Sequence, residues 1–98
     1  MSPARNNVRT ASFRDLFDQL PITIRQLAEE AFHAFEVNPD HPALRRHRLK
    51  DNDRGRHRQG SFSVSITLKY RALYFEDAQT NVWYWIGSHA DYDTFTGV

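Results

Sequence analysis

The first half of the chain places apolar residues with the period of an α-helix. Apolar residues recur at i, i+3, i+4 and i+7 between residues 13 and 20, which is the spacing of one helical face. Ser12 precedes them and is expected to be the N-cap of this helix. Pro21 interrupts the pattern. A second apolar stripe predicts a longer helix over residues 22–37, ending before the stop signal Asn38-Pro39. The two stripes together predict a helical hairpin.

The second half of the chain changes to a period of two. From Phe62 to Leu68, apolar residues alternate with serine and threonine, which predicts a strand with one buried face and one polar face. Further strands are expected over residues 70–75 and 82–86, separated by a turn at residues 77–81. Because both connections are short, the three strands are predicted to form an antiparallel meander.

The ends of the chain add three smaller predictions. A short strand is possible over residues 7–11, residues 1–6 are expected to be disordered, and a short final helix is expected over residues 90–95. The whole is an α+β fold, in which a helical hairpin packs on one face of a small antiparallel sheet. The length of 98 residues predicts a single domain, residues 1–98.

The composition of the chain excludes several classes of functional site. The chain has no cysteine, which excludes disulfides and thiolate metal ligands. No apolar run approaches the roughly 20 residues that a membrane span requires, and the first residues do not read as a secretory signal. These features predict a cytoplasmic protein with no membrane partner, no metal and no small-molecule cofactor. Four histidines show no metal-ligand spacing: His33, His41, His47 and His57.

The net charge of +1 hides a strongly uneven distribution of cations. Seven of the 13 Lys and Arg residues lie within residues 44–60, a segment named here the basic arm. Such a cluster favours contact with the phosphates of RNA, although an acidic segment of a protein partner would suit it equally well. A solvated loop is the plainer interpretation. The seven candidate RNA-binding residues are Arg45, Arg46, Arg48, Lys50, Arg54, Arg56 and Arg58.

The aromatic strand near the C-terminus ends at Gly87, and two residues that could take part in catalysis follow it. His89 has an imidazole that can donate or accept a proton near neutral pH. Tyr92 follows three residues later, on the same face of a helix. A surface histidine and a tyrosine that packs the C-terminus are the plainer interpretations. Trp83 and Trp85 fall on the same parity of the strand and are expected to be core or partner-facing residues.

Several segments resemble the RelE/ParE toxin superfamily of bacterial toxin–antitoxin systems. The resemblance runs from residue 7 onward and implies a twisted antiparallel sheet with an N-terminal helical hairpin. Many members cleave mRNA, often on the ribosome, and are silenced by a cognate antitoxin that wraps around them. Others poison DNA gyrase, and some have no established activity. The matching segments are Leu20-Pro21, Asn38-Pro39, His41-Pro42-Ala43-Leu44, Tyr70-Arg71-Ala72-Leu73-Tyr74 and the run from Trp85 to Asp93.

The resemblance also implies roles for individual residues. His89 occupies the strand-end position where RNase-active relatives carry a catalytic histidine, and Arg71 matches the phosphate-binding arginine of the family. A guanidinium suits that role because it is always charged and can bind in a bidentate manner. An ion pair of Arg71 with Asp91 or Asp93 is the alternative. Tyr92 is similar to a tyrosine that helps to orient or protonate in some relatives, although there it directly follows the histidine.

Two departures from the family weigh against activity. RelE-type enzymes carry lysines on the strand before the Tyr-Arg strand, whereas serines and a threonine stand here, and Ala43 after Pro42 leaves no obvious glutamate base. Three hypotheses therefore stand. The first is a toxin that cleaves mRNA without a metal, on or off the ribosome, and is bound by an antitoxin. The second is a non-nuclease or degenerate member that binds gyrase or only its antitoxin. The third is a plain nucleic-acid-binding module.

Overall fold

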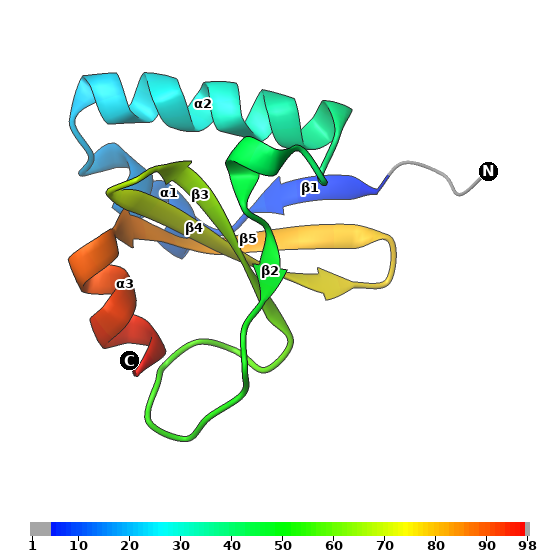
Figure 1. The fold of residues 1–98 in the computed structure, drawn as a ribbon, viewed down its shortest axis with the longest axis vertical. Helices are drawn as coiled ribbons and strands as arrows, with labels where there is room; N and C mark the ends of the chain where they lie inside the picture. The colour runs from blue at the N-terminus through cyan, green and yellow to red at the C-terminus, as the bar shows by residue number, and fades with distance from the viewer. Residues whose placement is uncertain (1–4, 98) are drawn as a thin grey trace.

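The computed structural model describes residues 5–97 and shows an α+β fold, with helices on both faces of one sheet (Figure 1). The predicted fold class is confirmed. The strands are β1 (Asn6–Arg9), β2 (His47–Arg48), β3 (Ser61–Thr67), β4 (Tyr70–Asp77) and β5 (Thr80–Ser88), in the spatial order β1-β5-β4-β3-β2. The helices are α1 (Ala11–Asp18), α2 (Ile22–Val37), the short 3₁₀ helix η1 (Pro42–Leu44) and α3 (His89–Thr96).

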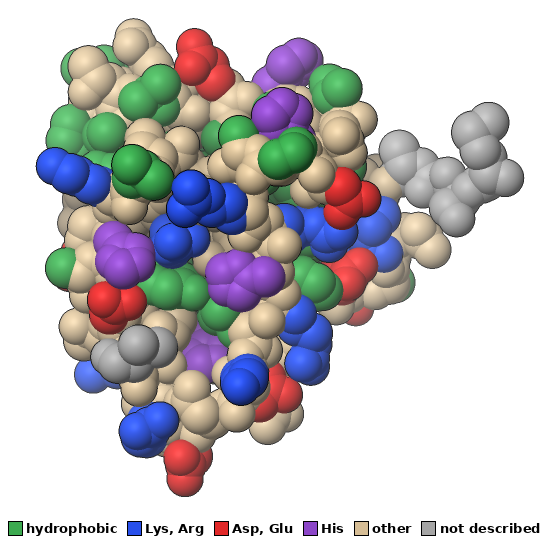
Figure 2. Space-filling model, in the orientation of Figure 1, with side chains coloured by type: hydrophobic (Ala, Val, Ile, Leu, Met, Phe, Trp, Pro, Cys, Tyr) green, Lys and Arg blue, Asp and Glu red, His purple; other side chains and the backbone are tan. Residues whose placement is uncertain are grey.

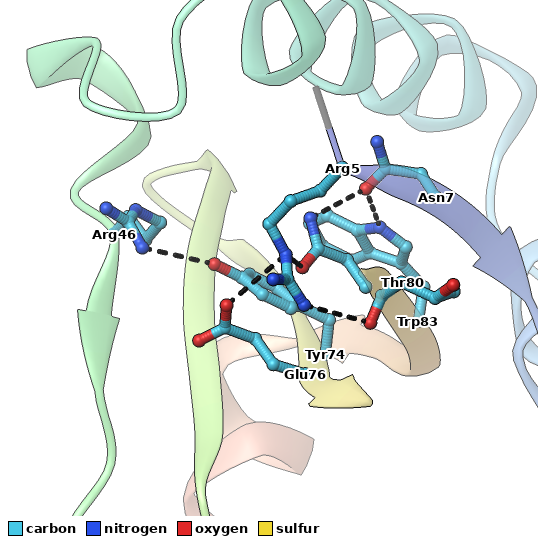
Figure 3. Close-up of polar contacts among 8 residues, drawn as sticks. Arg5, Asn7, Arg46, Tyr74, Glu76, Thr80 and Trp83 are labelled. Atoms are coloured by element: carbon cyan, nitrogen blue, oxygen red, sulfur yellow. Dashed lines mark hydrogen bonds and ion pairs between the residues drawn. The ribbon is translucent and has the colours of Figure 1, made fainter. Parts of the chain in front are cut away.

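The sheet contains the predicted antiparallel meander β3-β4-β5, but it is a mixed sheet, because β1 pairs with β5 in parallel. Most of the expected disordered segment lies outside the described residues. Arg5 and Asn6 are described, and for them the prediction is wrong. The Arg5 guanidinium donates to Asn81 Oδ1 and to the carbonyl of Thr80, and it lies 3.3 Å from a carboxylate oxygen of Glu76 (Figure 3). These contacts hold the start of β1 on β5.

The helical hairpin begins two residues earlier than the sequence predicted. Thr10, not Ser12, is the N-cap of α1, because its Oγ1 accepts a hydrogen bond from the amide of Phe13 at 3.1 Å. The hydroxyl of Ser12 instead donates to the carbonyl of Tyr84 on β5. Pro21 separates the two helices as predicted, and α2 occupies the predicted range.

The first core lies between the hairpin and one face of the sheet. Phe13 of α1 and Phe32 and Phe35 of α2 bury their rings against Tyr74 and Trp83. The ring of Trp83 has its centroid 4.8 Å from that of Phe32 and 5.1 Å from that of Phe35, both edge to face. Aromatic pairs of this geometry contribute about 0.5–1.5 kcal/mol each beyond the area that they bury. This aromatic cluster fixes α2 across β4 and β5.

A second core lies on the opposite face of the sheet, where the final helix α3 packs. Here Leu49 of the basic arm, Leu73, Trp85 and Tyr92 of α3 pack together. This second layer also covers the polar side of β3, which the alternation pattern had left in solvent. Three serines are therefore buried rather than exposed: Ser61, Ser63 and Ser65.

A β-bulge explains how two tryptophans of the same parity reach different cores. Leu73 of β4 pairs with Trp85, whereas the next residue, Tyr74, pairs with Trp83. Tyr84 is therefore the extra residue, and the strand changes face there. Trp83 packs in the first core and Trp85 in the second. The prediction that both are core residues is confirmed, although their equal parity does not place them on one face of the sheet.

Candidate functional site

Arg71 lies on β4 between Ser65 of β3 and Gly87 of β5, on the sheet face that α3 covers. Its Nη1 donates to Ser65 Oγ at 2.8 Å, and its Cζ is 5.3 Å from the ring centroid of Tyr92. Its Nε is buried and has no hydrogen-bond partner among the described residues. A guanidinium has five N–H donors, so most of its donor capacity is left for a ligand.

His89 is the first residue of α3. Its backbone amide donates to the carbonyl of Lys69 at 2.7 Å, which ties the start of the helix to the β3–β4 turn. Ser88 is the N-cap, and its hydroxyl accepts from the amide of Asp91. The imidazole remains 47% exposed, and its Nδ1 is 3.6 Å from a carboxylate oxygen of Asp93. A half-exposed imidazole in this position is accessible to a substrate.

Tyr92 brings the other two residues together. Its side chain is buried, and its ring stacks against the imidazole of His89 with a centroid distance of 5.9 Å. The same ring contacts the guanidinium of Arg71. The alternative interpretation, an ion pair of Arg71 with Asp91 or Asp93, is not found among the described residues, where Asp93 pairs with His89. The three residues singled out from the sequence thus form one cluster.

Gly87 adjoins this cluster, and the absence of a side chain there leaves room for a neighbouring ring. A Cβ atom at this position would lie 2.8 Å from the ring of Trp85, so a larger residue would displace that ring. The Trp85 ring in turn packs on Tyr92, with a centroid distance of 6.3 Å. The glycine at the end of β5 therefore lets the tryptophan support the wall of the site.

The basic arm does not present its seven cations on one surface. Arg46 points to the other side of the sheet, where its guanidinium donates to Asp40 and to the hydroxyl of Tyr74 (Figure 3). The hydrogen bond to Asp40, followed by that to Tyr74, raises the pKa of Arg46 above its ordinary value. Burial raises the pKa of Tyr74. Arg46 is therefore engaged in a structural contact on the face of the sheet away from α3.

Two more arm residues have local partners. Arg48 lies 3.6 Å from Asp51, and the guanidinium of Arg58 lies 3.8 Å from the ring centroid of Phe75. The rest of the arm returns toward α3, since the amide of Arg56 donates to the carbonyl of Phe95. Figure 2 shows histidine side chains beside cationic ones on the face that carries α3, β2 and the arm. The remaining cations, Arg45, Lys50, Arg54 and Arg56, make no ion pair within residues 5–97.

His47 is a candidate that the sequence pattern did not single out. It lies on β2 opposite Ser63 of β3, and opposed residues of paired strands share a face. His47 is therefore on the same face as Arg71. A strand of two residues leaves no alternation pattern, so only the pairing itself reveals where this side chain lies.

Within residues 5–97 there is no group of three or more His, Asp or Glu side chains that could hold a metal ion. Over the same part of the chain, no helix combines the length and the apolar character needed to cross a membrane.

Comparison with known proteins identifies the class. A family model described as the ParE-like toxin domain matches residues 23–94, and the chain belongs to this family of toxins. The predicted membership of the RelE/ParE superfamily is thereby confirmed. No match is found among curated proteins.

Solved structures of toxin–antitoxin proteins share the fold. A chain of the toxin–antitoxin complex RelBE2 from Mycobacterium tuberculosis is 24% identical, with a TM-score of 0.65 over 89% of this chain and 100% of that chain. YafQ from Escherichia coli is 11% identical, with a TM-score of 0.67 over 90% and 97%. A YoeB/ParE toxin from Agrobacterium tumefaciens is 17% identical, with a TM-score of 0.64 over 86% and 98%.

Proposed function

We propose that this toxin is a metal-independent endoribonuclease that cleaves mRNA. The observation that carries the proposal is the cluster of Arg71, Tyr92 and His89, in which a guanidinium with no ion pair among residues 5–97 and an exposed imidazole contact the same ring. A cation that can bind phosphate, next to a group that can donate or accept a proton, is the minimum that RNA cleavage by the neighbouring 2′-hydroxyl requires.

The reaction needs two proton transfers and one site for negative charge. The 2′-oxygen attacks the adjacent phosphorus, the bond to the 5′-oxygen breaks, and a 2′,3′-cyclic phosphate and a 5′-hydroxyl result. Arg71 stabilises the charge that develops on the phosphate oxygens, because its planar fork matches two of them. His89 serves as the acid that protonates the leaving oxygen or as the base that removes the 2′-proton. His47, on the same sheet face, is available for the second transfer.

We propose a cognate antitoxin as the natural protein partner. The support is that two of the solved structures with this fold, RelBE2 and an archaeal RelE–RelB complex from Pyrococcus horikoshii, contain a toxin with its antitoxin. An antitoxin that covers α3 would also cover His89, which is exposed on this helix. Binding would then silence the proposed nuclease by excluding RNA.

The function is tested by induced expression in bacterial cells of the wild type, His89→Gln and Arg71→Ala, with growth and mRNA integrity followed by primer extension. Wild type should arrest growth and produce discrete mRNA cuts, and both variants should lose the cuts. The matched controls are His33→Gln and Arg14→Ala, which change the same residue types on exposed helix positions. Cuts that persist in His89→Gln, with the fold intact, would contradict the proposed role of the imidazole.

A non-nuclease member of the same fold is the second candidate. The observation that favours it is the face of β3 next to Arg71, which presents Ser63 and Ser65 rather than the lysines of RelE-type enzymes. Its mark in the same experiment is growth arrest without mRNA cuts, which also survives the loss of His89 and Arg71. Gyrase activity would then be measured next. A plain nucleic-acid-binding module would instead show salt-sensitive RNA binding without arrest or cuts.

A further inference from the structure

The C-terminal end of α3 depends on the basic arm for part of its hydrogen bonding. The last four carbonyls of an α-helix, here those of residues 93–96, have no partner within the helix. The amide of Gly97 donates to the first two of them. The other two accept from the arm, which passes beside this end of the helix (Figure 1). Their donors are the backbone amide of Arg56, at 2.6 Å, and the side-chain amide of Asn52, at 3.1 Å.

Asn52 uses both ends of its side-chain amide. Its Oδ1 accepts from the backbone amide of Arg54 at 3.0 Å and from that of Gly55 at 2.7 Å, which fixes a turn in the arm. Its Nδ2 donates to the carbonyl of Thr96 at the end of α3. One side chain therefore shapes the arm and also attaches it to α3, and only the attachment requires the N–H donor.

Two glycines allow the arm and the end of the helix to approach closely. A Cβ atom on Gly55 would lie 2.5 Å from the carbonyl oxygen of Thr96, and a Cβ atom on Gly97 would lie 2.7 Å from the backbone nitrogen of Gly55. Gly97 also has a φ of 79°, which glycine adopts without steric strain. A side chain at Gly55 would therefore push the arm away from α3 and break the hydrogen bonds that Asn52 and Arg56 donate.

The attachment reaches the candidate site through Thr96. This residue is buried, and its Oγ1 donates to the carbonyl of Tyr92 at 2.8 Å. The ring of Tyr92 contacts both the guanidinium of Arg71 and the imidazole of His89. Because α3 has only eight residues, it is too short to be stable in isolation, and its position depends on its contacts with the rest of the fold. The amide of His89 fastens its start to Lys69, and the arm fastens its end.

We propose that Asn52 is a positioning residue for the mRNA cleavage proposed above, on which this inference rests. Its hydrogen bond to Thr96 fastens the last turn of α3. The fastened helix in turn holds the Tyr92 ring and the His89 imidazole beside Arg71. The arm thereby contributes to the rate of cleavage through the geometry of α3, independently of any contact between its cations and RNA.

The decisive variant is Asn52→Asp. Aspartate keeps the Oδ1 acceptor that shapes the arm, but an ionised carboxylate has no N–H to donate to Thr96. Asn38→Asp is the matched control, with the same change in charge. Asn38 is exposed at the end of α2, where its Oδ1 accepts from the amide of Asp40. Gly55→Ala changes no charge and displaces the arm from α3 by a second route.

The first measurement is the imidazole NMR signal of His89 in each full-length protein. This signal senses the stacked ring of Tyr92 and is observed whether or not the protein cleaves RNA. It should shift in Asn52→Asp and in Gly55→Ala, and it should stay in place in Asn38→Asp. If Gly55→Ala does not fold, the comparison of the two aspartate variants decides.

The second measurement is the kinetics of mRNA cleavage with ribosomes present. At saturating mRNA, the rate should fall by about tenfold or more in Asn52→Asp and in Gly55→Ala, since a displacement of about 1 Å can cost about 100-fold. Asn38→Asp should keep the wild-type rate. The affinity of Gly55→Ala for RNA should stay within about twofold of wild type, because the variant keeps every cation of the arm.

The outcomes separate the positioning role from the nuclease itself. A His89 signal that does not move in Asn52→Asp overturns the positioning role, and so does an equal shift in Asn38→Asp, because only charge would then matter. A Gly55→Ala variant that loses RNA affinity but keeps the rate at saturating mRNA also overturns it, since the arm would then act in binding alone. A wild type that cleaves no mRNA, with the predicted shifts of His89, contradicts the nuclease and supports the role of Asn52 in placing His89.

Discussion

The guanidinium of Arg71 lies 5.3 Å from the ring centroid of Tyr92, while its Nη1 donates to Ser65 Oγ at 2.8 Å. The arginine is therefore held from two sides, by a helix and by a neighbouring strand. Preorganised charge of this kind stabilises a transition state without reorganisation at the moment of reaction. Of the orienting and protonating roles that the resemblance implies for Tyr92, this pairing favours the orienting one, since its ring contacts both Arg71 and His89.

This role predicts that the ring of Tyr92 matters more than its hydroxyl. Tyr92→Phe should keep RNA cleavage within about twofold, whereas Tyr92→Leu should lower it about tenfold, which corresponds to the loss of a cation–π contact of roughly 1–2 kcal/mol. Cleavage rates of the two purified variants on the same mRNA give the comparison. If Tyr92→Phe is as inactive as Tyr92→Leu, the hydroxyl takes part in the chemistry and the supporting role is wrong.

Ser65 and Ser63 form a matched pair on the same face of β3. Ser65→Ala removes the hydrogen bond to Arg71 and leaves a second donor of the guanidinium, next to the buried Nε, without a protein partner. The free energy of unfolding should fall by about 1–3 kcal/mol. Ser63→Ala should cost little, because the Oγ of Ser63 is buried and has no partner among the described residues. Urea unfolding of both variants measures the difference, and equal losses would contradict the assigned hydrogen bond.

Alkaline stability should depend on Tyr84. Its hydroxyl accepts from the amide of Arg58 and donates to Ser61 Oγ, which in turn donates to the carbonyl of Arg58. Burial raises the pKa of Tyr84 above its ordinary value of 10.0, and the hydrogen bond to Ser61 lowers it by less. Above about pH 10 the unfolded chain therefore binds fewer protons than the folded one, and stability falls as pH rises.

The corresponding experiment is urea unfolding between pH 8 and pH 11. Tyr84→Phe should be less stable than wild type at pH 8, by about 1 kcal/mol for the lost hydrogen bonds. The free energy of unfolding of Tyr84→Phe should decline less steeply above pH 10, because this variant lacks a phenol whose pKa is raised in the folded protein. Tyr70→Phe, at the half-buried start of β4, is the control and should keep the wild-type slope. An unchanged slope in Tyr84→Phe would show that this phenol does not contribute.

The sequence predicted well those elements that local patterns determine. The range of α2 was predicted from its apolar stripe and from Pro21, and the helix has the same range in the structure. Arg71 and His89 were singled out by the family resemblance, and helix spacing added Tyr92 on the same face as His89; the structure brings the three together.

The same local patterns could not predict contacts between segments that are far apart in the sequence. The change of face at Tyr84 depends on how β5 pairs with β4, so the strand alone reads as continuous. The burial of Ser63 depends on a loop and a helix folding back over β3. Arg46 looked like one of several free cations because Asp40 and Tyr74, its partners, are visible only in three dimensions.

The most direct test of the account is the chemistry of the RNA ends that the protein produces. Purified toxin is mixed with mRNA, either with ribosomes in a buffer that contains Mg²⁺ or without ribosomes in the presence of a metal chelator, and the product ends are identified by mass spectrometry. Attack by the 2′-hydroxyl at a site formed by Arg71 and His89 predicts 2′,3′-cyclic or 3′-phosphate ends opposite 5′-hydroxyl ends, and neither in His89→Gln. Ends with a 3′-hydroxyl and a 5′-phosphate, or intact mRNA under both conditions, would contradict it.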